Sequence, residues 1–428
     1  MNAEQNVVAI IGAGLGTYAR YVMLIFGTAL ALALNQKSIP CRIYERRSED
    51  ADVLTSGVVI TPNGCRVLDE LGILDRVASK SYHSEYNIIK NERDETVEKV
   101  RVASKESTGY PYHRLYRLTL LRALKSMLNE RNIPVFYDSK FEKIISDTAD
   151  EVIFQVSGKK EKASVVVGCD GIHSSVRHYL TNTEPEYTGV LCVYGHIPTA
   201  SVQWPDEDFK NGCTIQGKPG GLFMIPEVAD MSELMVGTQF PYAEQDREGW
   251  DSLNANKGLL CSLLRKDYHQ WHNTAMTILD QLSEHSQGLL SWPFYAMPRL
   301  ATWASSSGRV VMIGDAAHVM PASSGQGVNQ ALEDALSLAM VLSSTRMNAT
   351  LPVALEFWHS WRQRKIDKVL QMAKATNFKR MPEAERLEIL QNQAVDSSSR
   401  GQISQDPLSW LFDLDLLTLD AKLMELVI

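Results

Sequence analysis

Residues 7–16 read VVAIIGAGLG, an apolar run that ends in the glycines Gly12, Gly14 and Gly16. The apolar residues predict a buried β-strand. The glycines predict a tight turn that brings the backbone close to a pyrophosphate at the start of a helix. A second β-rich run ends in Glu45, whose carboxylate can accept hydrogen bonds from ribose hydroxyls. These segments predict a βαβ unit with a parallel sheet that binds a dinucleotide.

The spacing within this unit departs from the usual dinucleotide-binding pattern. Glu45 lies 33 residues after Gly12, whereas about 20 to 25 residues are expected, and Thr17 stands at the third glycine position. Removing the ten residues 17–26 corrects both features, since Gly27 then supplies the third glycine and Glu45 lies 23 residues on. We therefore expect residues 17–26 to be an insertion. Either the insertion loops out and Gly27 restarts the helix, or the phosphate site is damaged.

A second strand-and-turn pattern occupies residues 166–177, VVGCDGIHSSVR. An apolar strand runs into an Asp170-Gly171 turn, and Ser and Arg residues then open a helix. This pattern fits a nucleotide-binding turn, and it equally fits a simple strand–turn–helix connection.

The third signature is the most specific, with GDAAH at residues 314–318 and GQGVN at residues 325–329. Asp315, at a strand end, can hydrogen-bond a chain of sugar-like hydroxyls. Gly325, Gly327 and Val328 offer backbone N–H groups at a helix start, which stabilise negative charge on a bound ring. His318 by itself could equally be a packed histidine.

Together the three signatures resemble the single-component aromatic hydroxylase family of FAD-dependent monooxygenases, typified by salicylate and p-hydroxybenzoate hydroxylases. The resemblance covers residues 7–375. It implies that Glu45 binds the adenosine ribose, that Asp315 binds the ribityl chain, and that the backbone around Gly327 and Val328 lies against the isoalloxazine.

Further matches add to the implied cofactor site. The family's R-x-x-L-x-x-x-L helix start corresponds to Arg117, Leu120 and Leu124, which implies that Arg117 contacts the cofactor. The stretch SGVVITPNG at residues 56–64 matches the family's loop after Glu45 and places Gly57 near the flavin, while the Asp170-Gly171 motif is associated with FAD and the nicotinamide cofactor. The predicted cofactor-binding residues are therefore Gly12, Gly14, Gly27, Glu45, Gly57, Arg117, Asp170, Asp315, Gly325, Gly327 and Val328.

The chemistry implied by the resemblance is carried by FAD, the bound cofactor, with NADPH or NADH docking transiently. Reduced FAD captures O2, and a flavin C4a-hydroperoxide hydroxylates or epoxidises an aromatic or polycyclic substrate, which we expect to be a specialised-metabolite intermediate. No catalytic side chain is assigned. Tyr194, His196 and Phe223 are candidate pocket residues, and plain packing is the alternative for each. Some relatives carry an arginine where Tyr194 stands, so the sequence argues against phenolate activation by arginine here.

The order of elements predicts an α/β fold in which a Rossmann-like FAD-binding domain is interleaved with a β-rich substrate domain, followed by a helical C-terminal tail. Tyr86 to Lys90 and Thr96 to Val102 predict a hairpin, and Leu115 to Leu128 predicts a helix. We expect the FAD-binding domain at residues 1–79, 106–184 and 296–375, the substrate domain at 80–105 and 185–295, and the tail at 376–428.

Composition limits the classes of partner. The 428 residues carry a formal net charge of −8 and no basic block, which argues against nucleic acid as a partner. The six cysteines lie apart with no C-x-x-C pair, which argues against a zinc site and favours a reducing compartment. No signal peptide is expected, and the 14 uncharged residues 21–34 are too few to span a bilayer. These features predict a cytoplasmic monomer or homodimer.

Two alternatives remain at the level of sequence. One is a related flavoprotein dehydrogenase or halogenase that does not insert oxygen, although WPFYAMP at residues 292–298 does not match the W-x-W-x-I-P stretch of halogenases. The other is a flavin-free protein, because of the insertion at 17–26.

Overall fold

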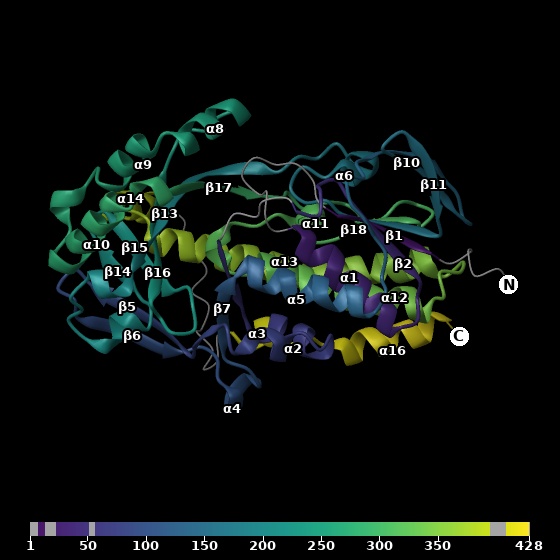
Figure 1. Cartoon of the computed structure of the whole chain (residues 1–428), viewed down its shortest axis with the longest axis horizontal. Coiled ribbons are helices and arrows are strands. Elements are labelled where there is room, and N and C mark those ends of the chain that lie inside the picture. The colour runs from purple at the N-terminus through teal and green to yellow at the C-terminus, as the bar shows by residue number, and fades with distance from the viewer. Residues whose placement is uncertain (1–6, 13–22, 51–55, 394–407, 428) are drawn as a thin grey trace.

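The computed structural model describes residues 7–12, 23–50, 56–393 and 408–427 of the chain. The described residues form two lobes along the long axis of the molecule (Figure 1). A five-stranded sheet organises one lobe and a seven-stranded sheet organises the other.

The five-stranded sheet is parallel, as the sequence predicts, and has the order β18-β12-β1-β2-β8. Both of its faces are covered, which explains the near-continuous apolar runs of its strands. Val8 and Ile10 pack in the main core, whereas Ala9 and Ile11 pack against a small antiparallel sheet, β11-β10-β9. The strands are β1 (Val8–Gly12), β2 (Cys41–Glu45), β8 (Val135–Phe136), β9 (Phe141–Asp147), β10 (Val152–Val156), β11 (Lys159–Ala163), β12 (Val165–Cys169) and β18 (Val310–Met312).

Helix α1 (Met23–Gln36) packs between the sheet and the helices α5 (Arg117–Glu130) and α12 (Gly327–Ser344). Its residues from 29 to 34 are all buried, which explains why this apolar stretch carries no charge. Within the described residues, no helix is long and apolar enough to cross a membrane. Helix α5 begins two residues later than the predicted helix start, because Leu115 ends up in strand β7 (Tyr112–Tyr116).

The predicted insertion needs a correction. Residues 17–22 lie outside the described residues, but residues 23–26 form the first turn of α1, with Ile25 and Phe26 buried in the core. Gly27 is therefore the fifth residue of the helix and does not restart it. A Cβ placed on Gly27 would lie 3.1 Å from Ile10 Cγ2 and 4.0 Å from Gly12 Cα. Gly27 thus permits the close helix–strand approach that the third glycine of a dinucleotide fingerprint provides.

The seven-stranded sheet has the order β17-β13-β16-β15-β14-β5-β6. The hairpin predicted around NERDE is confirmed, and its first strand pairs in parallel with β14. One face of the sheet packs against α8, α9 and α10 in a second core, and the other face looks toward the parallel-sheet lobe. The elements are β5 (Tyr86–Asn91), β6 (Thr96–Arg101), β13 (Glu186–Pro198), β14 (Thr214–Gly217), β15 (Gly220–Pro226), β16 (Glu233–Pro241), β17 (Leu290–Ala296), α8 (Arg247–Ala255), α9 (Lys257–Leu264) and α10 (Asn273–Glu284).

Helix α13 (Leu351–Arg380) extends from one lobe to the other and packs on both α12 and β15 (Figure 1). It continues without a break through residue 375, where the sequence placed a domain boundary, so that boundary does not coincide with the end of a helix. The remaining elements are β3 (Gly57–Ile60), β4 (Tyr82–Ser84), α2 (Pro62–Glu70), α3 (Leu74–Ala78), α4 (Lys105–Thr108), α6 (Ser175–Leu180), α7 (Glu207–Lys210), α11 (Asp315–His318), α14 (Glu383–Gln393), α15 (Ser409–Phe412), α16 (Leu416–Val427) and the 3-10 turns η1 (Thr199–Ser201), η2 (Tyr268–Gln270), η3 (Ser286–Gly288) and η4 (Ala322–Ser324).

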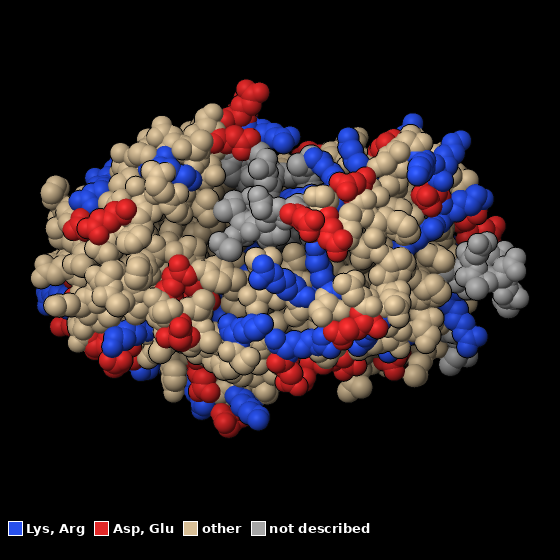
Figure 2. All heavy atoms as spheres, in the orientation of Figure 1, with Lys and Arg blue, Asp and Glu red and all other residues tan. Residues whose placement is uncertain are grey.

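Charged side chains of both signs are mixed over the two lobes on the face shown in Figure 2. A short row of basic side chains crosses the waist between the lobes, and no broad basic surface covers this face.

Candidate functional site

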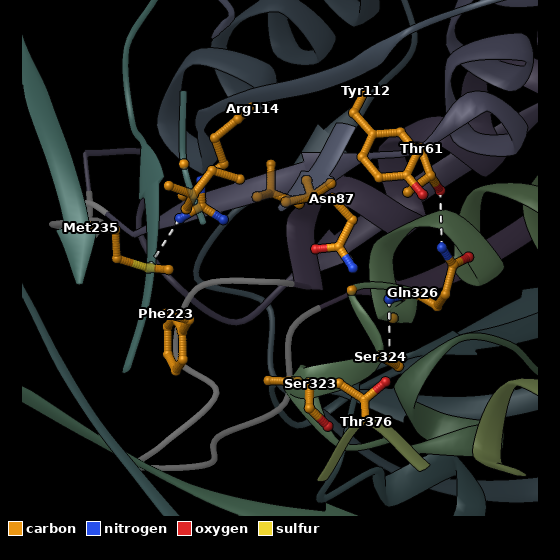
Figure 3. Close-up of a pocket in the computed structure, with 18 of the residues that line it drawn as sticks. Thr61, Asn87, Tyr112, Arg114, Phe223, Met235, Ser323, Ser324, Gln326 and Thr376 are labelled. Atoms are coloured by element: carbon orange, nitrogen blue, oxygen red, sulfur yellow. Dashed lines mark hydrogen bonds between the residues drawn. The ribbon is translucent and has the colours of Figure 1, made fainter. Parts of the chain in front are cut away.

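A cavity of about 550 Å³ lies between the two lobes and is lined by residues of both. Its size is within the usual range for small-molecule and cofactor sites. In Figure 3, Arg114, Met235 and Phe223 lie on one side of the cavity, and Gln326, Ser324, Ser323 and Thr376 lie on the other.

The GDAAH segment places a carboxylate at this cavity. Gly314 follows strand β18 with φ 61°, and its N–H donates to Asp334 Oδ2 at 2.9 Å. Asp315 then begins α11 and lines the cavity, and burial raises the pKa of its carboxyl. Among the described residues, no side chain or backbone donor binds this carboxylate. His318 is buried, bonds to Asp334 and stacks near Trp303, so its position is that of a packed, paired histidine.

The helix start predicted at Gly325 to Val328 also borders the cavity. Gly325 adopts φ 62°, and a Cβ placed on it would meet nothing within 4 Å. Helix α12 begins at Gly327, so its first N–H groups have no partner within the helix, and Gly327 and Val328 line the cavity. Asn329 fixes this turn, since its Oδ1 accepts from Thr61 N at 3.0 Å and its Nδ2 donates to the carbonyl of Gly325 at 2.8 Å. The result is a fixed, positively polarised helix end at the cavity wall.

Glu45 stands beside Gly12 in the register of the parallel strands β1 and β2. Its Oε1 accepts from the Arg47 N–H at 2.9 Å, while its Oε2 is buried without a hydrogen-bond partner. Burial raises the pKa of this carboxyl to about 7. Gly14, which the sequence predicts to bind the cofactor near Gly12, lies outside the described residues. The geometry therefore provides an unsatisfied acceptor next to the end of β1, as a ribose site requires.

Arg117 begins α5 and lines the cavity. Its Nη1 donates to Ser56 Oγ at 3.0 Å, and its guanidinium lies 5.1 Å from the centre of the Trp292 ring. Its Nε is buried without a partner, so this cation retains a donor for a further ligand.

Asp170 lies away from this arrangement, and both of its oxygens serve its own helix. It accepts from Ser174 Oγ, from Ser175 N at 2.7 Å and from Val176 N at 3.2 Å, which caps α6. Gly171 takes φ 77° at the turn. The geometry thus supports the strand–turn–helix alternative for this segment, and a contact with FAD stays a prediction.

An ion pair that sequence reasoning missed stands beside Gly57. Arg114 donates to Glu227 Oε2 through Nε at 3.1 Å and Nη2 at 2.7 Å. Its Nη2 also contacts Met235 Sδ at 3.1 Å, as the dashed line in Figure 3 marks. Glu227 Oε1 would lie 1.7 Å from a Cβ on Gly57, so a side chain at this position would displace the ion pair. The two partners are 113 residues apart, and no local pattern signals such a pair.

The inner face of the seven-stranded sheet forms the aromatic wall of the cavity. Tyr194 and Phe223 lie on it, as predicted for pocket residues, and Trp292 and Cys192 join them. Burial raises the pKa of the Tyr194 phenol, which keeps it protonated. Strand alternation places Phe223 and Met224 on opposite faces of β15. Met224 borders the cavity, but its side chain packs in the second core on the face opposite to Phe223.

His196 lies on the same face of β13 as Tyr194 but does not line the cavity. Its Nε2 lies 3.7 Å from Glu227 Oε2, and it is not among the described residues that line the cavity. The strand alternation that places Tyr194 on the inner face also places His196 there, but two residues further along β13.

Comparison with known proteins places this site in a family. A family model described as an FAD binding domain matches residues 5–373. A 6-methylsalicylate 1-monooxygenase of Aspergillus terreus is 25% identical over 96% of this chain and 89% of its own length. A 6-hydroxynicotinate 3-monooxygenase of Bordetella bronchiseptica is 24% identical over 79% of this chain and 83% of its own length.

Among solved structures, HpxO of Klebsiella pneumoniae complexed with FAD and uric acid is similar in fold, with a TM-score of 0.74 at 20% identity over 95% of this chain and 97% of that one. PqsL of Pseudomonas aeruginosa, a probable FAD-dependent monooxygenase, has a TM-score of 0.70 at 18% identity over 90% of this chain and 99% of that one. Because the family model spans most of the sequence, the chain belongs to the family of FAD-dependent aromatic monooxygenases and is a flavoprotein oxidoreductase.

Proposed function

We propose that this protein hydroxylates or epoxidises a small aromatic molecule, using FAD, O2 and NADH or NADPH. The observation that carries the proposal is the shared cavity. One wall holds Asp315 and the start of α12, and the facing wall is the aromatic face of the seven-stranded sheet. A redox ring and an aromatic substrate can therefore meet there. The substrates named for two relatives, 6-methylsalicylate and 6-hydroxynicotinate, are aromatic compounds.

The chain's own residues fit FAD. Two acceptors, the buried Glu45 Oε2 and the half-buried Asp315 carboxylate, lack partners among the described residues. A ribose and a ribityl chain each offer hydroxyl donors for such acceptors. The N-terminal N–H groups of α12 and the guanidinium of Arg117 supply positive potential at the cavity. A buried acceptor without a donor is costly, so a ribose hydroxyl would relieve Glu45, and ribityl hydroxyls would satisfy the open carboxylate of Asp315.

When bound, FAD would supply the electron transfer from NAD(P)H and the delivery of one oxygen atom to the substrate. The α12 N-terminus would hold the ring and stabilise negative charge on it. Tyr194, kept neutral by burial, would act as a hydrogen-bond donor toward the substrate and would not act as a base. The aromatic wall would orient the substrate and exclude water.

The test uses the full-length protein loaded with FAD. NADH or NADPH oxidation is followed with a panel of hydroxylated and amino-substituted aromatic compounds, and products are analysed after reaction under ¹⁸O2. We expect at least one compound to accelerate NAD(P)H oxidation and to gain one ¹⁸O atom. The matched variant Asp315→Asn, which keeps size but loses charge, should lower FAD content and activity together.

A protein that binds FAD but converts O2 only to hydrogen peroxide with every compound of the panel would contradict oxygen insertion. A protein that purifies without FAD and does not take it up would contradict the proposal as a whole.

A further inference from the structure

The last turn of helix α13 places an arginine at the wall of the cavity between the two lobes. Its last residue is Arg380, and Thr376 one turn earlier also lines the cavity wall, next to the η4 turn (Figure 3). The Arg380 guanidinium lies 5.0 Å from the centre of the Phe223 ring. The substrate side of the cavity thus has an arginine over an aromatic ring.

Two consecutive glycines of strand β15 allow Arg380 and the end of α13 to pack closely against the sheet. A Cβ on Gly220 would lie 2.7 Å from the Arg380 carbonyl oxygen, and a Cβ on Gly221 would lie 3.0 Å from Arg380 Cγ. Side chains at these two positions of β15 would therefore push the helix end away. Gln216 and Gln239 also fasten the last turn, through the carbonyl of Lys379 at 3.3 Å and Asn377 Oδ1 at 3.2 Å.

The last carbonyl groups of α13 do not need the Arg380 side chain as a hydrogen-bond donor. The carbonyls of Asn377, Phe378 and Lys379 already accept from Gln239, Met381 and Gln216. Among the described residues, no carboxylate pairs with Arg380, and none of them forms a hydrogen bond with its guanidinium. Arg380 is half-buried, and this burial lowers the pKa of its guanidinium. The negative end of the α13 dipole stabilises the charge in part.

The other charged side chains of the cavity either form an ion pair or lie on the cofactor side. The charged residues in its described lining are Arg114, Arg117, Arg380 and Asp315. Arg114 is neutralised by Glu227, and Arg117 and Asp315 stand on the cofactor side. Arg380 is thus an excess positive charge on the substrate side.

Arg117 and Arg380 lie at opposite ends of the aromatic wall. Arg117 lies over Trp292 on β17, and Arg380 lies over Phe223 on β15. Three strand steps separate β17 from β15, which corresponds to about 14 Å at the usual strand spacing. Tyr194 and Gly237 lie between them, and a Cβ on Gly237 would clash with Tyr194 and Phe223 at 2.7 Å. The Phe223 and Tyr194 side chains therefore fill the space above Gly237 and form the middle of the wall.

We propose that Arg380 is a specificity-determining residue that binds a carboxylate on the aromatic substrate, at the end of the cavity remote from Arg117. This assignment rests on the proposed function, because it assumes that the aromatic wall holds the substrate. A guanidinium can bind a carboxylate through two parallel hydrogen bonds, and the carboxylate would supply the counter-ion that Arg380 lacks among the described residues.

The experiment compares acids with their neutral amides on the full-length, FAD-loaded protein. Binding of 4-hydroxybenzoate and 4-hydroxybenzamide, and of salicylate and salicylamide, is measured by the change in flavin absorbance. Wild type should bind at least one acid about ten- to a hundredfold more tightly than its amide. Arg380→Gln should abolish this preference by weakening the acid alone, with FAD content unchanged and the melting temperature equal or higher.

Two further variants keep the test decisive. Arg380→Lys retains the charge without the planar fork, so an intermediate preference is expected. Lys379→Gln removes one positive charge from the exposed neighbouring residue of the same turn and should leave both affinities unchanged.

The inference is wrong if wild type binds acid and amide equally, or binds neither, or if Arg380→Gln weakens both ligands alike. Each of these results leaves the proposed function standing as long as FAD is bound and an aromatic product gains oxygen. Loss of FAD from the wild-type protein would instead count against the proposed function itself.

Discussion

Glu45 offers a quantitative test of the FAD site through pH. Its side chain is fully buried, its Oε2 has no partner, and burial raises the pKa of the carboxyl from its ordinary 4.5 to about 7. Hydrogen bonds from ribose hydroxyls favour the ionised form. FAD binding should therefore release a proton from Glu45 below pH 7 and become tighter as the pH rises.

The size of the effect follows from the fraction ionised. At pH 5.5 only about 3% of Glu45 is charged if the pKa is near 7, and at pH 8 about nine-tenths is charged. If FAD binds the charged form, its Kd should fall by roughly thirtyfold between these two values, equivalent to about 2 kcal/mol. Titrations of FAD fluorescence at half-unit pH steps measure this directly.

The stability of the apo-protein should change in the opposite direction. Folding raises the pKa of Glu45, so the folded state binds more protons than the unfolded state between pH 4.5 and 7. Stability is then greatest below pH 4.5 as far as this group is concerned, and it decreases by up to about 3 kcal/mol as the pH rises to 7. Melting temperatures of the FAD-free protein over this range test the sign.

Glu45→Gln is the matched control, because the amide keeps the shape of the carboxyl and does not titrate. Its Kd for FAD should vary little between pH 5.5 and 8. A flat profile in the wild type, or an equally steep profile in Glu45→Gln, would refute the assignment of this carboxylate to the ribose.

Three further outcomes follow from the site. Asp315→Ala should weaken FAD binding about ten- to a hundredfold while leaving the melting temperature of the apo-protein nearly unchanged; an unchanged FAD content after gel filtration would count against a cofactor role. Gly57→Ala should destabilise the fold by about 1–3 kcal/mol in urea denaturation, because its Cβ would overlap Glu227 Oε1, and a fully stable variant would show that this contact yields easily. Tyr194→Phe and Phe223→Ala should change substrate KM or increase peroxide release per NAD(P)H at constant FAD content, whereas loss of FAD from both would place them in the cofactor site.

The sequence predicted the positions of those candidate site residues that are placed by a strand end or a helix start next to them in the chain. Asp315 follows a strand and precedes a short helix, and Gly325 takes φ 62° just before α12 begins, so residue type and order are enough to expect them. Glu45 was predictable for the same reason, as the last residue of a strand that pairs with Gly12.

Long-range packing determines the rest. The Arg114–Glu227 pair joins segments 113 residues apart, and neither residue belongs to a motif. Arg380 was assigned to a C-terminal tail, because nothing near it in sequence shows that α13 crosses to the other lobe. The consecutive glycines Gly220 and Gly221 are a sequence feature that allows this contact. Their role can be recognised only from the structure, in which the end of α13 packs against them.

The packing of α1 also limits what the ten extra residues can affect. Gly27 is held against Ile10 and Gly12, and one residue of slippage would turn the helix by about 100° and bring a larger side chain into this contact. The register of α1 is therefore fixed from within the helix. Glu45 and Asp315 lie on elements that do not depend on the connection between Gly12 and Met23. We therefore expect changes within residues 17–22 to alter FAD affinity through the pyrophosphate end of the cofactor and to leave the pH dependence set by Glu45 unchanged.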